Sequence, residues 1–271
     1  LQIALAHIIF NVTTTAILLP MSRLLEKAAY FVVRGQDKEE EPMRLTYFDD
    51  RLFSTPPIAA KQLFREVTRM GELVKQNLAA SMDYFFAQKD TPLDEFNNRE
   101  NVIDYLNTEV TAKLIELRGM TLTPRDVHLM GSLFHVVNDL ERIGDHAVNI
   151  TEIADARRKA KKAFTNKALH ELETLYQTVA QSLEQAMEIV NRQIIDPAVI
   201  EKVSNLENEI DRMCDELTNH HMDRVKEKKC SPTNGMLFLD MLNNLERIGD
   251  HAENLATSVD SQNDDEKRLL W

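Results

Sequence analysis

Hydrophobic positions beyond residue 56 recur every three or four residues along the chain, as in the run from Leu172 to Val190. This spacing gathers apolar side chains on one face of an α-helix, so it predicts amphipathic helices rather than strands. Short polar segments interrupt the pattern at intervals. Helices are therefore expected over residues 57–88, 92–118, 124–160, 166–191, 197–229 and 232–260.

Prolines support these boundaries because most of them stand where a helix is expected to begin. A proline in the first helical turn costs little, since its missing N–H would have no partner there, and a polar residue before it can cap the helix. Gly119 follows the second predicted helix, as is typical of a helix end. The pairs concerned are Thr55-Pro56, Thr91-Pro92, Thr123-Pro124, Asp196-Pro197 and Ser231-Pro232.

The third and sixth predicted helices contain the same eight residues, LERIGDHA, at 140–147 and again at 245–252. An identity of this length indicates an internal repeat. The second and fifth predicted helices also correspond, through the segments RENVID and LENEID. The sequence therefore predicts an all-α protein of two tandem three-helix bundles, over residues 57–164 and 165–260.

The first 33 residues differ from the rest because they are strongly apolar, and residues 1–20 carry no charge. About 20 apolar residues suffice to span a bilayer, so a membrane-type hydrophobic helix is expected here. The alternative is a buried core helix of a soluble protein. Basic residues follow the span from Arg23 onward, which by the positive-inside rule puts its C-terminal side in the cytoplasm.

Composition and charge indicate which molecules the protein can bind and in which compartment it works. The formal net charge of −12 opposes nucleic-acid binding, which depends on neutralising phosphates. Cys214 and Cys230 are too few for a disulfide framework, which favours a reducing cytosol for this part. Residues 34–56 are charged and irregular and are expected to form a linker, and residues 261–271 a tail. Because the chain starts with Leu1, it is expected to continue upstream.

Glutamate and aspartate occur four residues apart at four related places in the repeat. Such residues lie side by side on a helix, where two carboxylates repel each other and favour a bound cation. Oxygen ligands suit hard ions such as Mg²⁺, Ca²⁺, Mn²⁺ and ferric iron. The candidate metal ligands are Glu100, Asp104, Glu141, Asp145, Glu207, Asp211, Glu246 and Asp250.

Neighbouring residues extend these acidic stripes. Gly144 and Gly249 stand inside the helices, where glycine costs about 1 kcal/mol against alanine, which suggests a close approach or room for ligands. His146 and His251 point about 100° away from the acidic pair and are expected to serve helix packing or the surroundings of the site. Four asparagines continue the stripe and are expected to support the ligands: Asn138, Asn149, Asn243 and Asn254.

Two other interpretations compete with a structural metal face. A single acidic pair on a helix is most simply a solvated surface, but four pairs in repeat register favour a metal site. A di-iron carboxylate enzyme would place a histidine three residues after a glutamate. Here the histidines follow the glutamates Glu141 and Glu246 by five residues, so the spacing fails and no enzyme is expected.

The segments LERIGDHAVNI and LERIGDHAENL resemble the signature of the PhoU domain. The resemblance covers roughly residues 57–260. It implies a fold of two three-helix bundles and multinuclear iron or zinc clusters held by the acidic motifs. All eight candidate ligands named above fall on these motifs. Manganese and magnesium remain alternatives to iron and zinc.

Residues in the N-terminal part of the chain resemble a second protein family. ALAHIIFNVTTTAILLP is similar to the last part of the membrane domain of bacterial Na⁺/phosphate cotransporters, and YFDDRLFSTPPIA to the junction before their C-terminal domain. The resemblance implies a C-terminal fragment of a sodium-dependent inorganic phosphate cotransporter, with the bundles as a cytoplasmic regulatory domain. The residues of the transport path are not identifiable in this fragment.

Partners and location follow from that resemblance. We expect an upstream transporter domain in the bacterial inner membrane, with residues after about 34 on the cytoplasmic side. The whole transporter would carry inorganic phosphate and sodium, nucleic acid is not expected, and a homo-oligomer stays open. The alternative function is a stand-alone PhoU-like adaptor of phosphate signalling, with the first 33 residues packed on the bundle.

Overall fold

The computed structural model describes residues 6–7, 10–15, 41–87, 92–160, 164–192 and 197–260. The predicted membrane helix at 1–33 lies outside the described residues except for two short pieces, and the tail at 261–271 lies outside them entirely. Among the residues described, no helix has both the length and the apolar character needed to cross a membrane.

From residue 41 onward the described chain is helical apart from its connections, which confirms the all-α prediction. The helix boundaries agree with the predicted ones to within a turn, because hydrophobic spacing fixed where each helix had to run. The elements are the 3-10 helix η1 (Asp50–Ser54) and the α-helices α2 (Pro56–Ala87), α3 (Asp94–Arg118), α4 (Pro124–Lys159), α5 (Asn166–Arg192), α6 (Pro197–Lys226) and α7 (Pro232–Asp260).

Helix starts follow the proline prediction with one exception. Thr123 caps α4, accepting a hydrogen bond from the backbone N–H of Asp126, and Pro124 occupies the first turn. Pro92 departs from the pattern because α3 begins two residues later, at Asp94, with no side-chain cap. Gly119 does end α3, although with an ordinary right-handed conformation.

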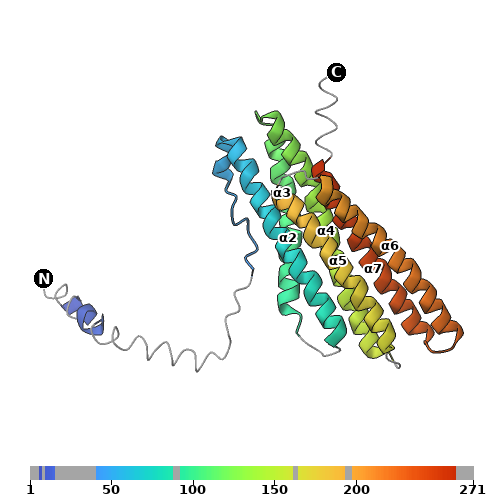
Figure 1. Ribbon diagram of the computed structural model, residues 1–271. Helices are drawn as coiled ribbons and strands as arrows, with labels where there is room; N and C mark the ends of the chain where they lie inside the picture. The colour runs from blue at the N-terminus through green and yellow to red at the C-terminus, as the bar shows by residue number, and fades with distance from the viewer. Residues whose placement is uncertain are drawn as a thin grey trace, which may run out of the picture. The chain divides into compact units, whose positions relative to one another are not determined.

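Helices α2, α3 and α4 pack together as one three-helix bundle, and α5, α6 and α7 form the second (Figure 1). The bundles join along α4 and α7, with a smaller contact between α2 and α5. The described residues from Glu41 to Asp260 form one compact unit. The predicted division at 164/165 falls between α4 and α5 inside this unit.

A single apolar core runs through both bundles, and its residues repeat 105 positions apart between α2 and α5 and between α4 and α7, and 107 positions apart between α3 and α6. Val67 and Leu172, or Val74 and Val179, are equivalent and fully buried. Burying such side chains contributes about 1.5–3 kcal/mol each and is the main source of stability. The repeat seen in sequence is therefore also a repeat of core positions, and it places the acidic stripes at equivalent points on the two bundles.

Polar side chains cross the join between α4 and α7. The ring nitrogen Nδ1 of His146 lies 2.8 Å from Oδ1 of Asn244, and Nδ1 of His251 lies 2.9 Å from Oδ1 of Asp139. The two imidazole rings are 5.8 Å apart. Burial lowers the pKa of His146, which favours its neutral form. Both histidines therefore serve helix packing, as predicted.

Residues 41–55 depart from the expectation of an irregular linker, because they are docked on α2. The fully buried carboxylate of Glu66 accepts hydrogen bonds from the backbone N–H groups of Tyr47 and Phe48. The guanidinium of Arg69 donates to the carbonyl oxygens of Pro42 and Arg44, at 2.8 Å and 3.1 Å. A buried acid and base can thus hold a segment whose composition alone is typical of a linker.

Glu66→Ala is expected to release residues 41–48 from α2. The change leaves two backbone N–H groups without a partner and Arg69 without its buried carboxylate, which should cost about 2–4 kcal/mol of unfolding free energy. Trypsin cleavage after Arg44 should become faster. Glu72→Ala is the control, since Glu72 lies on the exposed side of the same helix. Equal cleavage rates in both variants would rule out this anchoring role.

Candidate metal centre

The first bundle brings its four predicted acidic residues together across α3 and α4. Burial raises the pKa of Glu100 to about 7, against a hydrogen bond from Asn77, and the charges of Asp104, Asp145 and Glu141 raise it further. Burial and the charge of Asp145 also raise the pKa of both Asp104 and Glu141. These mutual effects indicate that the four carboxylates are neighbours on the surface of α3 and α4.

The second bundle holds the tighter cluster, on α6 and α7. One carboxylate oxygen from each of Glu207, Asp211 and Asp250 lies within 4.8 Å of the others. Within the described residues this is the one set of three potential ligands that meets so closely. Burial, reinforced by Asp211, raises the pKa of Glu207 to about 7. Burial, Asp211 and Asp250 raise the pKa of Glu246, which places it at the same cluster.

Arginines balance only part of this negative charge. Arg142 lies 3.8 Å from Glu141 and 3.7 Å from Asp145, and Arg247 lies 3.1 Å from Asp250. Both arginine side chains are more than half exposed. Ion pairs of this kind contribute about 0–1 kcal/mol, too little to offset the repulsion among three or four neighbouring carboxylates. The clusters therefore remain suited to a cation.

The two clusters differ because one glutamate is anchored and the other is not. Asn77 is fully buried and donates a hydrogen bond of 3.0 Å from Nδ2 to Oε2 of Glu100. Its equivalent in the second bundle is Ser182, a buried residue whose hydroxyl has no hydrogen-bond partner. The shorter serine leaves Glu207 without this anchor, which is consistent with its close approach to Asp211 and Asp250.

The space beside the two glycines inside the helices is filled by side chains of neighbouring helices, and not by a second backbone. A Cβ atom at Gly144 would lie 3.3 Å and 3.4 Å from the two carboxylate oxygens of Glu100. A Cβ atom at Gly249 would lie 3.0 Å from Cδ1 of Ile210. Gly144 thus makes room for a candidate ligand, while Gly249 makes room for a buried apolar residue.

Alanine at the two glycines should therefore have different effects. Gly144→Ala is expected to push Glu100 out of place and weaken metal binding by the first bundle, with stability nearly unchanged. Gly249→Ala should lose about 1 kcal/mol, since overpacking against Ile210 exceeds the gain in helix propensity. Urea unfolding and Mn²⁺ titration of both variants measure this. Equal loss of metal affinity in the two would contradict the distinction.

The available donors fit a hard metal ion. The clusters offer carboxylate oxygens, which suit iron(III), manganese and magnesium, whereas zinc favours nitrogen and sulfur. His146 and His251 are engaged at the α4–α7 join. Cys214 is a core residue, and burial raises the pKa of its thiol to about 12. The donor set thus supports a metal site of oxygen ligands, in which the roles of the eight predicted residues stay a prediction.

The four predicted supporting asparagines are all exposed: Asn138, Asn149, Asn243 and Asn254. Asn149 donates to Oδ1 of Asn244 at 3.1 Å and so joins the helix contact rather than a cluster. Sequence reasoning missed Asn77, whose role depends on a different helix. It also missed Glu253, whose charge raises the pKa of Glu207. Glu253 follows Asp250 by three residues, a helical spacing that would have revealed it.

The sequence of this chain is similar to a known protein family and to several known proteins. The family described as the PhoU domain matches residues 67–154 and 172–259, one copy in each bundle. The phosphate-specific transport system accessory protein PhoU homolog of Clostridium acetobutylicum is 24% identical over 201 residues, which cover 73% of this chain and 90% of that protein.

A second kind of relative extends over the front of the chain. The putative inorganic phosphate export protein YjbB of Salmonella typhimurium is 21% identical over 267 residues. The match covers 97% of this chain but 48% of that protein, so the chain spans about half the length of this relative.

Among solved structures, the crystal structure of PhoU from Pseudomonas aeruginosa is similar with a TM-score of 0.68 and 20% identity. The match covers 76% of this chain and 96% of that one. Because the sequence identity is this low, the similarity supports the fold alone. The structural similarity confirms the tandem arrangement of the two bundles.

Proposed function

The chain belongs to the PhoU family, a regulatory family without enzymatic activity, and from this we propose that it regulates the transport of inorganic phosphate. The observation that carries the proposal is the presence of two family domains, each with its own cluster of carboxylates. The PhoU homolog of Clostridium acetobutylicum bears the name of a phosphate transport accessory protein.

In this proposal a metal ion is the stabilising partner of each bundle. When bound, the metal supplies positive charge to carboxylates that otherwise repel each other. Glu207 and Asp211 on α6 and Asp250 on α7 would hold it in the second bundle, and Glu100, Asp104, Glu141 and Asp145 in the first. Because the ligands come from two helices, loading would favour one relative placement of those helices over others. Iron or manganese fits the oxygen donors better than zinc.

The second candidate is a regulatory domain attached to its own transporter, here a sodium-dependent phosphate cotransporter. The observation that favours attachment to a transporter is the YjbB match, which runs over 97% of this chain, whereas the match to the PhoU homolog of Clostridium acetobutylicum covers 73%. That relative is named as an export protein, so sodium dependence rests on the sequence resemblance alone. In this arrangement residues 1–33 would end a membrane domain of the bacterial inner membrane, and the bundles would lie in the cytoplasm. Sodium and phosphate would then be substrates of the upstream part.

One experiment tests regulation, and another separates the two candidates. Uptake of radiolabelled phosphate is compared between cells with the native gene and cells whose gene carries Glu141→Gln, Asp145→Asn, Glu246→Gln and Asp250→Asn together. A changed rate at equal protein level supports regulation through the carboxylates, and equal rates would reject it. Membrane fractionation of the native gene product then decides whether the regulator is attached or stand-alone.

A further inference from the structure

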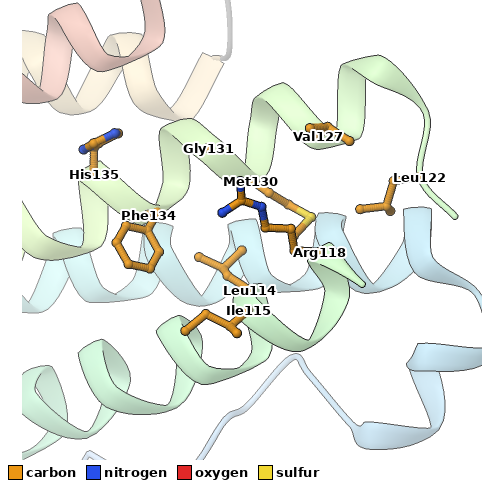
Figure 2. A pocket seen from close by; sticks show the side chains of 9 residues that line it. All are labelled: Leu114, Ile115, Arg118, Leu122, Val127, Met130, Gly131, Phe134 and His135. Atoms are coloured by element: carbon orange, nitrogen blue, oxygen red, sulfur yellow. The ribbon is translucent and has the colours of Figure 1, made fainter. Parts of the chain in front are cut away.

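An apolar groove opens between α3 and α4 at the end of the first bundle where these helices are joined (Figure 2). Its cavity volume is about 310 Å³. Three of its apolar side chains are widely exposed, with exposed fractions of 62% for Ile115, 52% for Val127 and 45% for Phe134. Exposed apolar residues gathered in one hollow mark a surface that another segment covers.

The groove has room at its centre and positive charge at its side. A Cβ atom at Gly131 would meet nothing within 4 Å, so the wall is open at this point. Arg118 and His135 line the groove together with the apolar residues. In a chain of net charge −12, this combination fits a segment that is apolar and acidic.

The corresponding connection of the second bundle, between α6 and α7, lines a different and more polar pocket, with His221, Arg224 and Asn234 in its wall. The position equivalent to Gly131 is Met236, and the position equivalent to Phe134 is Leu239. Both of these side chains are exposed on α7. Leu239 lines neither this pocket nor the groove of the first bundle, so it provides a matched exposed position for comparison.

The end of α7 reaches α4 beside the groove. The hydroxyl of Ser132 donates a hydrogen bond of 2.9 Å to the carbonyl oxygen of Ser258, and Ser132 is adjacent to the groove residue Gly131. The chain leaves α7 after Asp260 and continues with the sequence SQNDDEKRLLW. This continuation contains three consecutive acids, Asp264 to Glu266, then the basic pair Lys267 and Arg268, and then the apolar group Leu269 to Trp271.

We propose that residues 261–271 dock in this groove of their own chain, with Leu269, Leu270 and Trp271 against Ile115, Val127 and Phe134. The acids at 264–266 lie toward Arg118. The reach is sufficient, since the nine residues from Ser261 to Leu269 can extend up to about 30 Å beyond the end of α7. The groove residue Val127 is only about 7.5 Å from Ser132 along the axis of α4. Because ring contacts bury a large area, the tryptophan contributes most to docking.

Fluorescence provides a direct test, since Trp271 is the single tryptophan of the 271-residue chain. In the parent chain, docking predicts emission at short wavelength and protection of the indole from acrylamide. Phe134→Glu should move the emission to longer wavelength and increase quenching. The matched variant Leu239→Glu, at the equivalent position of the second bundle, should leave both unchanged. Circular dichroism confirms that each variant is folded.

Charge reversal tests the polar half of the contact. Arg118→Glu should expose the tryptophan partly, and adding Asp264→Lys, Asp265→Lys and Glu266→Lys should restore its protection. Emission at long wavelength in the parent, or protection that survives Phe134→Glu, would overturn the proposal. Protection that disappears on dilution would also overturn it, because the groove would then hold the tail of a second copy.

Discussion

Asp250→Asn is expected to lower the affinity of the second bundle for Mn²⁺ by about 100-fold or more, which corresponds to about 2.7 kcal/mol of binding free energy. Asp250 supplies the carboxylate from α7 that lies within 4.8 Å of Glu207 and Asp211 on α6, so its loss removes one of the three ligands that meet most closely. The same change should stabilise the metal-free protein by about 1 kcal/mol, because it relieves repulsion among the three carboxylates. The exposed ion pair with Arg247 offsets little of that gain.

Calorimetric titration with Mn²⁺ and urea unfolding in a chelator measure the two effects. Glu201→Gln is the control, since Glu201 is an exposed acid on α6, outside the cluster, and loses the same charge. Asp145→Asn makes the equivalent change in the first bundle and should leave the second bundle's site intact. Unchanged Mn²⁺ affinity in Asp250→Asn, or equal effects of Glu201→Gln, would mean that the carboxylates do not form the site.

The helices and the acidic stripes could be predicted because both depend on local spacing. Apolar residues three and four apart fix a helix face, and two acids four apart must lie together on it. The repeated LERIGDHA then identifies which helices correspond. The equivalent clusters around Glu141 and Glu246 could therefore be predicted from the sequence alone.

Contacts between distant segments could not be predicted in the same way. Asn77 anchors Glu100 from a different helix, and Ser182 takes its place in the second bundle, so the clusters differ although their motifs match. The docking of residues 41–48 depends on a buried Glu66 that resembles any other acid of α2 in sequence. Spacing within one helix carries no information about such partners.

Metal-free protein is expected to lose stability as the pH rises from about 4.5 to about 7, opposite to the usual effect of carboxylates. Glu100 and Glu207 have pKa values raised to about 7 from an ordinary value of 4.5. In this range the folded state therefore binds more protons than the unfolded state, and each rise in pH favours unfolding. The loss is on the order of 2 kcal/mol for each cluster, after allowance for solvent screening, and it is complete above about pH 7.

Saturating Mn²⁺ should reverse this dependence, since the metal binds the deprotonated carboxylates and its affinity rises with pH. Urea unfolding at about pH 5 and about pH 8, in a chelator and in Mn²⁺, gives the four values needed. The double variant Glu100→Gln, Glu207→Gln should show a much weaker dependence in the chelator, because the two pKa values raised to about 7 are removed. If the metal-free parent instead gained stability between these pH values, Glu100 and Glu207 would already be ionised without strain. The clusters would then have no need of a cation, and the acidic stripes would be solvated surface.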